Sequence, residues 1–346
     1  MGLNTGIILF NLGTPEEPST EKVKVYLKEF LMDEDVIDIP FIPRWLLVNQ
    51  IILRTRPSKS AEAYQKIWTE RGSPLRYHST DLVTKLASLF KTGHHVELAM
   101  RYGSPSLETA MKNFMKLGVN RLVVFPLYPQ YAKASVGSSL KQLTLLKKKL
   151  NWEVETTIVP PFYQSPHFID AWKSVAKPYL DAFKPDHVLM SFHGLPERHV
   201  KETDLTGKHC LASVTCCESI VEANKNCYRA QSFATARALA QSLNLKKSDY
   251  TVSFQSRLGR TPWIKPYTDL VFSDLSKRGV KRLAVMCPAF VADCLETLEE
   301  IGIRGKESFK KFGGEDLCLI PSLNSHDLWV DAVHSLLKER ITEWIG

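Results

Sequence analysis

The stretch Val188–Pro196, VLMSFHGLP, decides how the rest of the chain is interpreted. His187–Phe192 is a short apolar run bounded by a Pro-Asp pair before it and by Gly194 after it, which is typical of a buried strand in a parallel sheet. His193 falls where this strand ends, and Gly194 and Pro196 predict a turn. Ligands of open α/β sheets bind beyond the carboxyl ends of strands, so His193 is a candidate functional residue. The simpler alternative is a polar strand end that hydrogen-bonds a neighbouring loop.

Seven further apolar runs predict strands, and helical patterns alternate with them. We expect these strands at Gly6–Asn11, Val96–Met100, Arg121–Pro126, Trp152–Val159, Tyr250–Phe254, Arg282–Met286 and Leu317–Ile320. Helices are expected at Ser139–Leu150, Phe233–Leu243 and His326–Ile345. A further helix is expected after Ser104 and Pro105, because a serine can serve as its N-cap and a proline is favoured in the first turn. Strands that alternate with helices indicate an α/β fold with parallel sheets.

The strands fall into two sets of four, divided near Pro160 and Pro161. We therefore expect two similar Rossmann-like domains, residues 1–160 and 161–325, each a four-stranded parallel sheet flanked by helices and both facing one cleft. The final helix, 326–346, could pack back on the first domain.

Composition is that of a soluble globular protein, with 44% hydrophobic and 24% charged residues in 346. The net charge of +8 could attract an acidic small molecule or an anionic membrane surface. Nucleic acid is disfavoured because no run of like charge is longer than Lys147–Lys149. The chain has no apolar stretch long enough for a spanning helix and no secretory signal, and its seven cysteines are an odd number. These features predict a cytoplasmic protein.

The segment Phe41–Arg56, FIPRWLLVNQIILRTR, is too apolar for an ordinary surface helix. One interpretation is a buried helix. The other is an apolar lip with Arg44, Arg54 and Arg56 at its rim, which could touch a membrane and admit an apolar substrate.

Four of the seven cysteines, Cys210, Cys216, Cys217 and Cys227, form a C-x5-C-C-x9-C pattern within 18 residues. Four thiolates that converge suit an iron–sulfur cluster or structural zinc. The spacing matches no standard pair of C-x2-C motifs, so it does not choose between these metals, and coincidence in a reduced protein is the third alternative.

Asp293, Glu296 and Glu300 recur at i, i+3 and i+7, so their carboxylates would share one face of a helix beginning near Asp293. Such a row could carry protons or a cation. The alternative is that Asp293 and Glu296 form a capping box, which would satisfy the first amides of the helix.

The S-x-H-G-L-P stretch, taken with CPAFVADCLETLEE at 287–300, resembles the ferrochelatases of the proteobacterial type. The resemblance continues through NLGTP at 11–15, GSP at 72–74, RYGSPS at 101–106, LYPQY at 127–131 and QSRLGRTPW at 255–263. It implies the two-domain chelatase fold and an enzyme that inserts Fe²⁺ into protoporphyrin IX with release of two protons, the terminal step of haem synthesis. Alternatives are a coproporphyrin ferrochelatase and a non-catalytic tetrapyrrole carrier or sensor.

The resemblance also implies roles for single residues. His193 would be the base that accepts a pyrrole proton, and Glu296 its partner, with both facing the substrate iron. Glu300 and Asp293 would extend a path for protons or iron. Residues that would contact the porphyrin are Leu12, Tyr64, Ser73, Arg101, Tyr102 and Tyr128. Cys294 occupies the place where many relatives have a second histidine, which argues against a mechanism that requires a histidine pair.

Some ferrochelatases hold a [2Fe–2S] cluster, usually with most ligands near the C-terminus and one internal. This chain has no cysteine after Cys318, and Lys133 takes the place of the internal ligand. We therefore expect a local [2Fe–2S] cluster on Cys210, Cys216, Cys217 and Cys227. The expected enzyme is cytoplasmic, with peripheral contact to the inner membrane through Phe41–Arg56, and its oligomeric state is not predicted.

Overall fold

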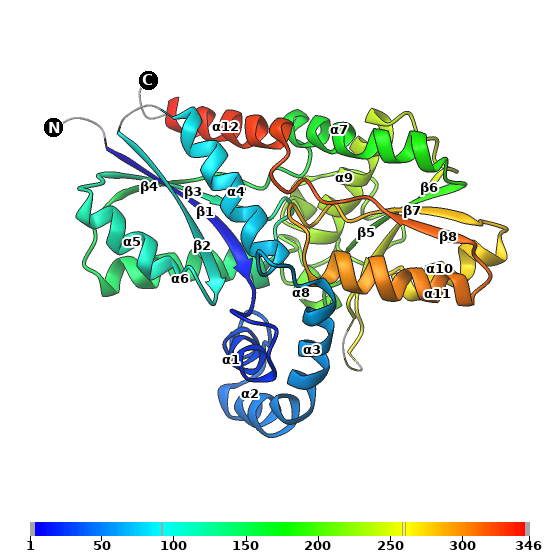
Figure 1. Ribbon diagram of the computed structural model, residues 1–346, viewed down its shortest axis with the longest axis horizontal. Coiled ribbons are helices and arrows are strands. Elements are labelled where there is room, and N and C mark those ends of the chain that lie inside the picture. The colour runs from blue at the N-terminus through cyan, green and yellow to red at the C-terminus, as the bar shows by residue number, and fades with distance from the viewer. Residues whose placement is uncertain (1–3, 91–92, 258, 260, 343–346) are drawn as a thin grey trace. The chain divides into compact units, whose positions relative to one another are not determined.

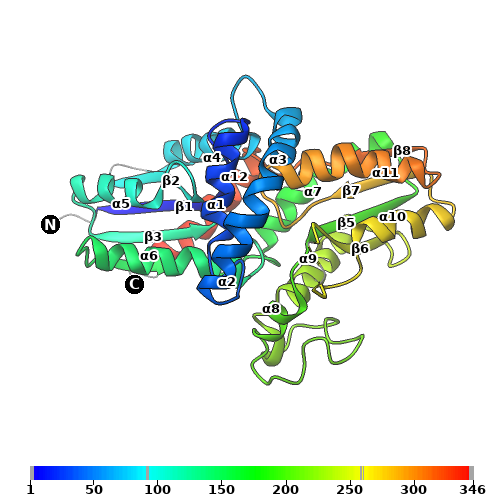
Figure 2. The same cartoon turned by 90° about the horizontal axis from the view of Figure 1, so that it is seen from below.

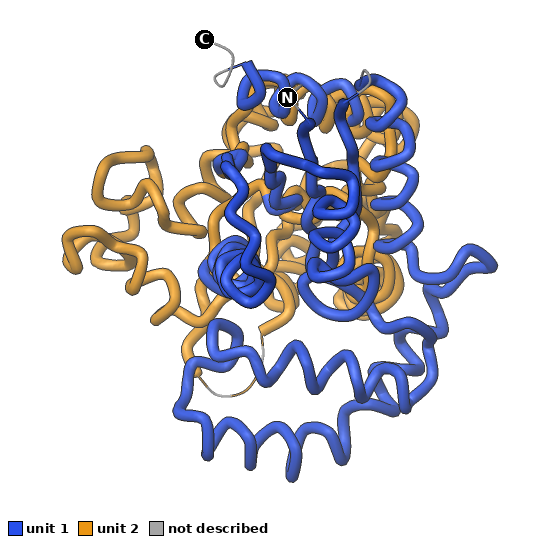
Figure 3. The backbone as a smooth tube through the Cα atoms, turned by 90° about the vertical axis from the view of Figure 1, so that its left-hand side faces the viewer, with its two compact units in different colours: residues 1–128, 133–160, 330–346 blue, residues 129–132, 161–329 orange. Residues whose placement is uncertain are grey.

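The computed structural model describes residues 4–342 except 91–92, 258 and 260. The chain forms two compact units (Figure 3). Unit 1 comprises Met1–Tyr128, Lys133–Pro160 and Val330–Gly346, and unit 2 comprises Pro129–Ala132 and Pro161–Trp329. Within 255–263, Leu258 and Arg260 lie outside the described residues, as do residues 343–346 of the final predicted helix.

Unit 1 is built on an all-parallel sheet in the order β2-β1-β3-β4 (Figure 1). Its strands are β1 Thr5–Gly13, β2 His94–Tyr102, β3 Arg121–Pro126 and β4 Glu155–Ile158. One face packs Ile8 and Phe10 against α5 (Leu107–Lys116) and α6 (Ser138–Lys149), which follows the short π-helix η2 (Lys133–Gly137). The other face, on which Ile7 and Leu9 alternate with them, is covered by α4 (Pro74–Leu89).

A helical arm extends from the sheet of unit 1. It consists of α1 (Thr20–Leu31), α2 (Phe41–Leu46), the π-helix η1 (Leu47–Ile52) and α3 (Leu53–Ile67). Figures 1 and 2 show α1 and α3 side by side with α2 at the far end of the arm. The predicted lip, Phe41–Arg56, is this far end.

Unit 2 repeats the topology of unit 1, with the parallel order β6-β5-β7-β8. Its strands are β5 His187–His193, β6 Tyr250–Gln255, β7 Arg282–Met286 and β8 Asp316–Leu319. One face is covered by α10 (Thr268–Lys277), the π-helix η4 (Glu296–Gly305) and α11 (Lys306–Lys311), and α7 (Pro166–Phe183) and α9 (Tyr228–Ser242) pack on the other side. Between β5 and α9 lie α8 (Glu197–Lys201) and a loop with the short η3 (Glu222–Asn224).

The predicted fold class is confirmed: all eight expected strands form, four in each sheet. Two helix starts differ from the prediction. The N-cap of α5 is Ser106, whose hydroxyl accepts from the Thr109 amide, and not Ser104. Helix α9 begins at Tyr228, before the predicted Phe233, because the Cys227 sulfur caps it. The last helix, α12, spans Asp327–Thr342. Among the residues described, none of the helices combines the length and apolar character needed to cross a bilayer.

Candidate functional site

His193 is the last residue of β5 and is half-buried. Its Nδ1 lies 2.6 Å from the carbonyl oxygen of Gly194. A carbonyl only accepts, so Nδ1 of the neutral ring donates and the lone pair remains on Nε2. Gly194 has no room for a side chain, because a Cβ there would lie 2.6 Å from the Gln255 carbonyl oxygen. The turn after β5 therefore fixes both the direction and the tautomer of the imidazole.

Gln255 connects His193 to Glu296. It is the residue paired with His193 in the β5–β6 register and is 3% exposed. Its Oε1 accepts from the Ser191 hydroxyl at 2.7 Å, which assigns the orientation of the amide. Its Nε2 then donates to the main-chain oxygen of Glu296 at 2.8 Å. This buried amide therefore connects the start of η4 to the sheet edge at which β5 ends.

Glu296 is the first residue of η4 and is half-buried. The predicted α-helix at this position is a π-helix, so the i, i+3, i+7 argument for one shared face does not apply as stated. The neighbouring Cys294 is buried, and burial together with the charge of Glu296 and a hydrogen bond to it raises the pKa of the thiol well above its ordinary value. A thiol that stays protonated donates to the carboxylate, which favours a structural role for Cys294 over metal binding.

The other two carboxylates of the predicted path accept hydrogen bonds from neighbouring segments of unit 2. Asp293 accepts from the Thr297 hydroxyl at 3.0 Å, the Ser322 amide at 3.2 Å and the Asn324 side chain at 2.8 Å. These bonds connect it to the 322–324 segment, and they differ from those of the proposed capping box with Glu296. Glu300 accepts from the Ser256 amide at 2.8 Å and the Ser256 hydroxyl at 2.5 Å.

Ser256 can direct both of these donors at Glu300 because its backbone is left-handed, with φ of 63°. A left-handed non-glycine residue is uncommon and costs about 1–2 kcal/mol. Ser256 therefore anchors η4 to the end of β6, on the same edge of the sheet as His193.

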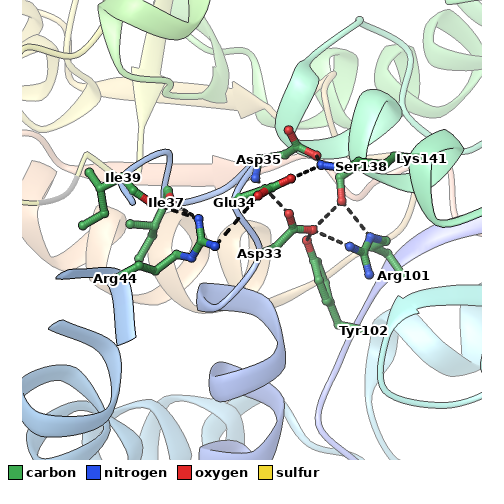
Figure 4. Close-up of polar contacts among 10 residues, drawn as sticks. All are labelled: Asp33, Glu34, Asp35, Ile37, Ile39, Arg44, Arg101, Tyr102, Ser138 and Lys141. Carbon is green, nitrogen blue, oxygen red and sulfur yellow. Dashed lines mark hydrogen bonds and ion pairs between the residues drawn. The ribbon is translucent and has the colours of Figure 1, made fainter. Parts of the chain in front are cut away.

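In unit 1, Asp33 accepts four hydrogen bonds at the carboxyl end of β2, one of them from the Asp35 amide at 2.8 Å and three from side chains (Figure 4). It accepts from the guanidinium of Arg101, from the Tyr102 hydroxyl at 2.8 Å and from the Ser138 hydroxyl at 2.5 Å. Burial opposes the charged carboxylate, but the hydrogen bond from Ser138 and its other partners hold the pKa of Asp33 below its usual value. Arg101 also donates from Nε to Ser138 at 2.7 Å. Two of the predicted porphyrin contacts, Arg101 and Tyr102, are therefore fixed by one buried acid.

The remaining predicted porphyrin contacts also lie in unit 1. Ser73 precedes α4, and its hydroxyl lies 2.8 Å from that of Thr14, which follows β1. Tyr64 is buried in α3, Leu12 is half-buried near the end of β1, and Tyr128 follows β3. Tyr102 is 0% exposed, so its ring packs in the core of unit 1.

The lip exposes its apolar side chains, contrary to the buried-helix alternative. The exposed fractions are 62% for Phe41, 71% for Ile42, 40% for Trp45, 49% for Leu46 and 60% for Ile51. Arg44 does not lie at a rim: it is 7% exposed and donates to the main-chain oxygens of Ile37 and Ile39. It thereby closes the turn that leads into α2, while Val48 and Leu53 face inward.

The four clustered cysteines lie in and beside a loop held by two polar side chains. The Asp204 carboxylate accepts from the amides of His209 and Cys210, both at 2.7 Å. Asn224, fully buried, donates at 2.9 Å to the main-chain oxygens of Cys216 and Ser219. The backbone around the thiols is therefore ordered by the protein itself.

All four thiols are buried and contact one another in pairs. Cys216 and Cys217 have sulfurs 3.7 Å apart, and Cys227 hydrogen-bonds both Cys210 and Cys217. Burial raises the pKa of Cys210 to about 11. Within the described part of the chain, however, no three His, Cys, Asp or Glu side chains are arranged to hold a metal ion as they stand. The four cysteines of the predicted cluster thus adjoin one another, but they form no metal-binding group in this structure.

Several residues of these sites were not predicted: Asp33, Asn224, Gln255, Ser256, and Arg229, whose Nη1 lies 3.1 Å from the Cys217 sulfur. Gln255 and Ser256 follow a predicted parallel strand directly, which is the signal that identified His193, and the same rule applied to β6 would have found them. Asp33, Asn224 and Arg229 carry no comparable signal, because their partners are defined by the tertiary fold or by an irregular loop.

Comparison with known proteins identifies the family of this chain. The family model named Ferrochelatase matches residues 4–341. A curated ferrochelatase of Legionella pneumophila (strain Corby) is 48% identical over 342 residues, covering 98% of this chain and 100% of the relative. A curated ferrochelatase of Coxiella burnetii (strain Dugway 5J108-111) is 45% identical over 336 residues, covering 97% and 94%.

Among solved structures, "SirB from Bacillus subtilis with Fe3+" superposes with a TM-score of 0.54 at 13% identity, covering 97% of this chain and 95% of that one. At this identity the likeness concerns the fold alone. The sequence matches carry the functional conclusion: the chain belongs to the ferrochelatase family, enzymes that insert a metal into a porphyrin.

Proposed function

We propose that this ferrochelatase inserts Fe²⁺ into protoporphyrin IX and that His193 is the base that removes pyrrole protons. The observation that carries the assignment is the hydrogen bond from His193 Nδ1 to the Gly194 carbonyl at 2.6 Å. It leaves Nε2 as the acceptor of the neutral ring, on a strand end that cannot shift freely. A neutral imidazole is suited to accept a proton from a weakly acidic N–H group.

The overall reaction exchanges two pyrrole protons for one Fe²⁺, so charge is conserved. His193 Nε2 accepts a proton as a pyrrole nitrogen lone pair turns to the iron. In our proposal the Glu296 carboxylate faces the entering cation and compensates its charge; the main chain of Glu296 is held by Gln255, the register partner of His193. Glu300 and Asp293 hold η4 and the 322–324 segment in place through these hydrogen bonds, and in our proposal their remaining lone pairs extend a path for protons or iron.

The residues that we propose for the porphyrin site in unit 1 are Leu12, Tyr64, Ser73, Arg101, Tyr102 and Tyr128. Tyr102, whose ring is fully buried, would support Arg101 and not touch the macrocycle. Aromatic side chains suit a flat macrocycle, and an arginine suits a propionate through its forked donors. Nε and one terminal nitrogen of Arg101 are already used by Ser138 and Asp33, so the propionate would be held by the remaining guanidinium donors.

The apolar lip favours protoporphyrin IX over the more acidic coproporphyrin, because an exposed apolar surface suits the substrate with fewer carboxylates. Anaerobic assays with both porphyrins side by side test this preference. We expect the loss of porphyrin fluorescence with Fe²⁺ to show a kcat/KM at least tenfold higher for protoporphyrin. Equal or reversed values would assign the enzyme to coproporphyrin. Stoichiometric porphyrin binding without turnover would support the carrier alternative.

We also propose that the lip attaches a cytoplasmic enzyme peripherally to the inner membrane. Phe41, Ile42, Trp45 and Leu46 present an apolar face of the kind that inserts at a bilayer surface. Co-sedimentation with phosphatidylglycerol vesicles should fall several-fold in Ile42→Glu. Val25→Glu, a change at an exposed valine of α1, is the matched control. Equal binding by both variants would contradict the assignment.

A [2Fe–2S] cluster on Cys210, Cys216, Cys217 and Cys227 is our proposal for the cysteine site. Thiolates about 2.3 Å from one tetrahedral metal lie about 3.8 Å apart. The 3.7 Å between the Cys216 and Cys217 sulfurs therefore suits a shared metal. A site completed by small movements of Cys210 and Cys227 would supply four thiolates. Since metallation needs no redox step, the cluster would serve structure or sensing.

The test is iron and sulfide analysis of anaerobically purified protein together with its visible spectrum. Two irons and two sulfides in the wild type, lost in Cys227→Ser and kept in Cys318→Ser, would support the cluster. Colourless protein with one zinc would keep the site and change its metal. Protein with neither would remove it.

A further inference from the structure

Arg229 lies against the cysteine site and is held there by several contacts. Its Nη1 points at the Cys217 sulfur from 3.1 Å and is 3.9 Å from the Cys216 sulfur. Its Nε donates to the main-chain oxygen of Lys265 at 3.2 Å, and its guanidinium lies 4.8 Å above the centre of the Phe233 ring. An arginine held in this way is a preorganised charge and not a mobile surface side chain.

The thiols that Arg229 touches are buried, at 5% exposure each for Cys216 and Cys217. The hydrogen bond with Cys227 and burial raise the pKa of Cys217, and Arg229 acts in the opposite direction. An acidic side chain of the loop, Asp204, is turned to the backbone amides of His209 and Cys210. Arg229 is therefore the side chain of α9 that favours negative charge on these sulfurs.

Burying thiolates is unfavourable unless a positive charge and hydrogen bonds compensate for the lost water. A four-thiolate [2Fe–2S] centre carries two negative charges when oxidised and three after one-electron reduction. A fixed cation beside two of the ligand sulfurs favours both states over an empty site, and it favours the reduced state more, because that state carries the additional electron.

We propose that Arg229 is the positioning residue that neutralises the Cys216–Cys217 pair and sets the reduction potential of the metal centre held there. The inference depends on the cysteine cluster proposed above. It adds that the redox behaviour of the centre is determined by one guanidinium outside the ligand set, as second-sphere hydrogen bonds to sulfur generally tune such centres.

Arg237 provides a matched control. It is half-buried like Arg229 and belongs to the same helix, but its Nη1 donates to the main-chain oxygen of Cys217 at 2.9 Å and not to a sulfur. Arg229→Gln removes the charge and keeps a hydrogen-bond donor, and Arg229→Lys keeps the charge without the planar fork. Arg237→Gln removes a charge of the same sign from the same helix.

The experiment is an anaerobic redox titration of the visible spectrum of the wild type and the three variants, with iron and sulfide counted in each. We expect the ratio of reduced to oxidised cluster at a given potential to fall about tenfold or more in Arg229→Gln, equivalent to about 59 mV for one electron. Arg229→Lys should recover most of this change, and Arg237→Gln should differ from the wild type less than threefold.

A cluster in Arg229→Gln with the wild-type potential overturns the inference and leaves the cluster itself intact. A wild type without iron and sulfide overturns both. If Arg229→Gln loses its cluster on purification, Zn²⁺ is titrated into the apoproteins against a chromophoric chelator. We then expect about a 10–100-fold loss of Zn²⁺ affinity in Arg229→Gln and not in Arg237→Gln. Equal affinities would again overturn the role of Arg229.

Discussion

Replacing Asp33 by asparagine tests whether one buried acid holds the carboxyl end of β2 together. The Asp33 side chain is 6% exposed, and its partner Arg101 is 15% exposed. An asparagine at this site keeps one carbonyl oxygen for Ser138 or Tyr102, but it turns an NH₂ group toward donors and leaves the guanidinium without a counter-charge. Breaking one side of a buried pair costs about 3–5 kcal/mol.

Arg101 retains some contact with water, so the expected loss is at the lower end, about 3 kcal/mol in the free energy of unfolding. That corresponds to about a hundredfold change in the unfolding equilibrium. Urea unfolding followed by circular dichroism measures it. Asp181→Asn is the control, because Asp181 forms an ion pair at 2.8 Å with Lys177 in which both side chains are more than half exposed. Surface pairs of this kind contribute about 0.3–0.5 kcal/mol.

The pH dependence adds a second check. The pKa of Asp33 is lowered in the folded protein, so its stabilisation is complete above the ordinary carboxyl range and is lost as pH falls through the lower folded value. The difference between wild type and Asp33→Asn should be constant near neutral pH and shrink below about pH 4. If Asp33→Asn unfolds within about 0.5 kcal/mol of Asp181→Asn at pH 7, the proposed role of Asp33 is wrong.

Three further predictions concern the strand ends and the cysteine loop. Ser256→Ala loses the hydroxyl bond to Glu300 and keeps the left-handed backbone, so it should lower the free energy of unfolding by about 2 kcal/mol. Ser256→Gly loses the same bond but relieves the backbone strain, so it should lower that free energy by only about 1 kcal/mol. Equal urea midpoints for the two variants would contradict this. Gly194→Ala places a Cβ 2.6 Å from the Gln255 carbonyl and shifts the turn beside His193, so the steady-state rate should fall about 100-fold; a normal rate would refute the tight turn. Asn224→Ala frees the carbonyls of Cys216 and Ser219, so limited proteolysis should cut the 204–227 loop faster than in the wild type, and an unchanged cleavage rate would rule out this role.

The strands could be predicted from sequence because each is a compact apolar run. β3 and β7 begin and end where the pattern predicted, since a polar residue precedes each strand and a proline lies at or just after its end (Pro126 and Pro288). The longer strands β1 and β2 extend beyond their apolar cores into residues whose pairing depends on the neighbouring strand. His193 could be predicted because its position at a strand end and the family resemblance agree.

The polar contacts of the sites could not be predicted from the sequence, because they depend on the tertiary fold. Asp33, Arg101 and Ser138 are separated by tens of residues, and only the parallel order of β2, β1 and β3 brings them together. Glu296 and Glu300 were placed on an α-helix, because their spacing alone does not distinguish that helix from the rarer π-helix that η4 adopts. The start of α9 was missed because cysteine is an unusual N-cap.

The account depends most directly on His193 as the proton acceptor. The measurement is the anaerobic initial rate of protohaem formation by His193→Ala, with porphyrin binding measured separately by absorption and with His167→Ala, a change at an exposed histidine of α7, as the control. We predict that His193→Ala binds porphyrin normally and loses about 10²–10⁴-fold in rate, while His167→Ala is unchanged. A His193→Ala enzyme that forms haem at the wild-type rate would contradict the account.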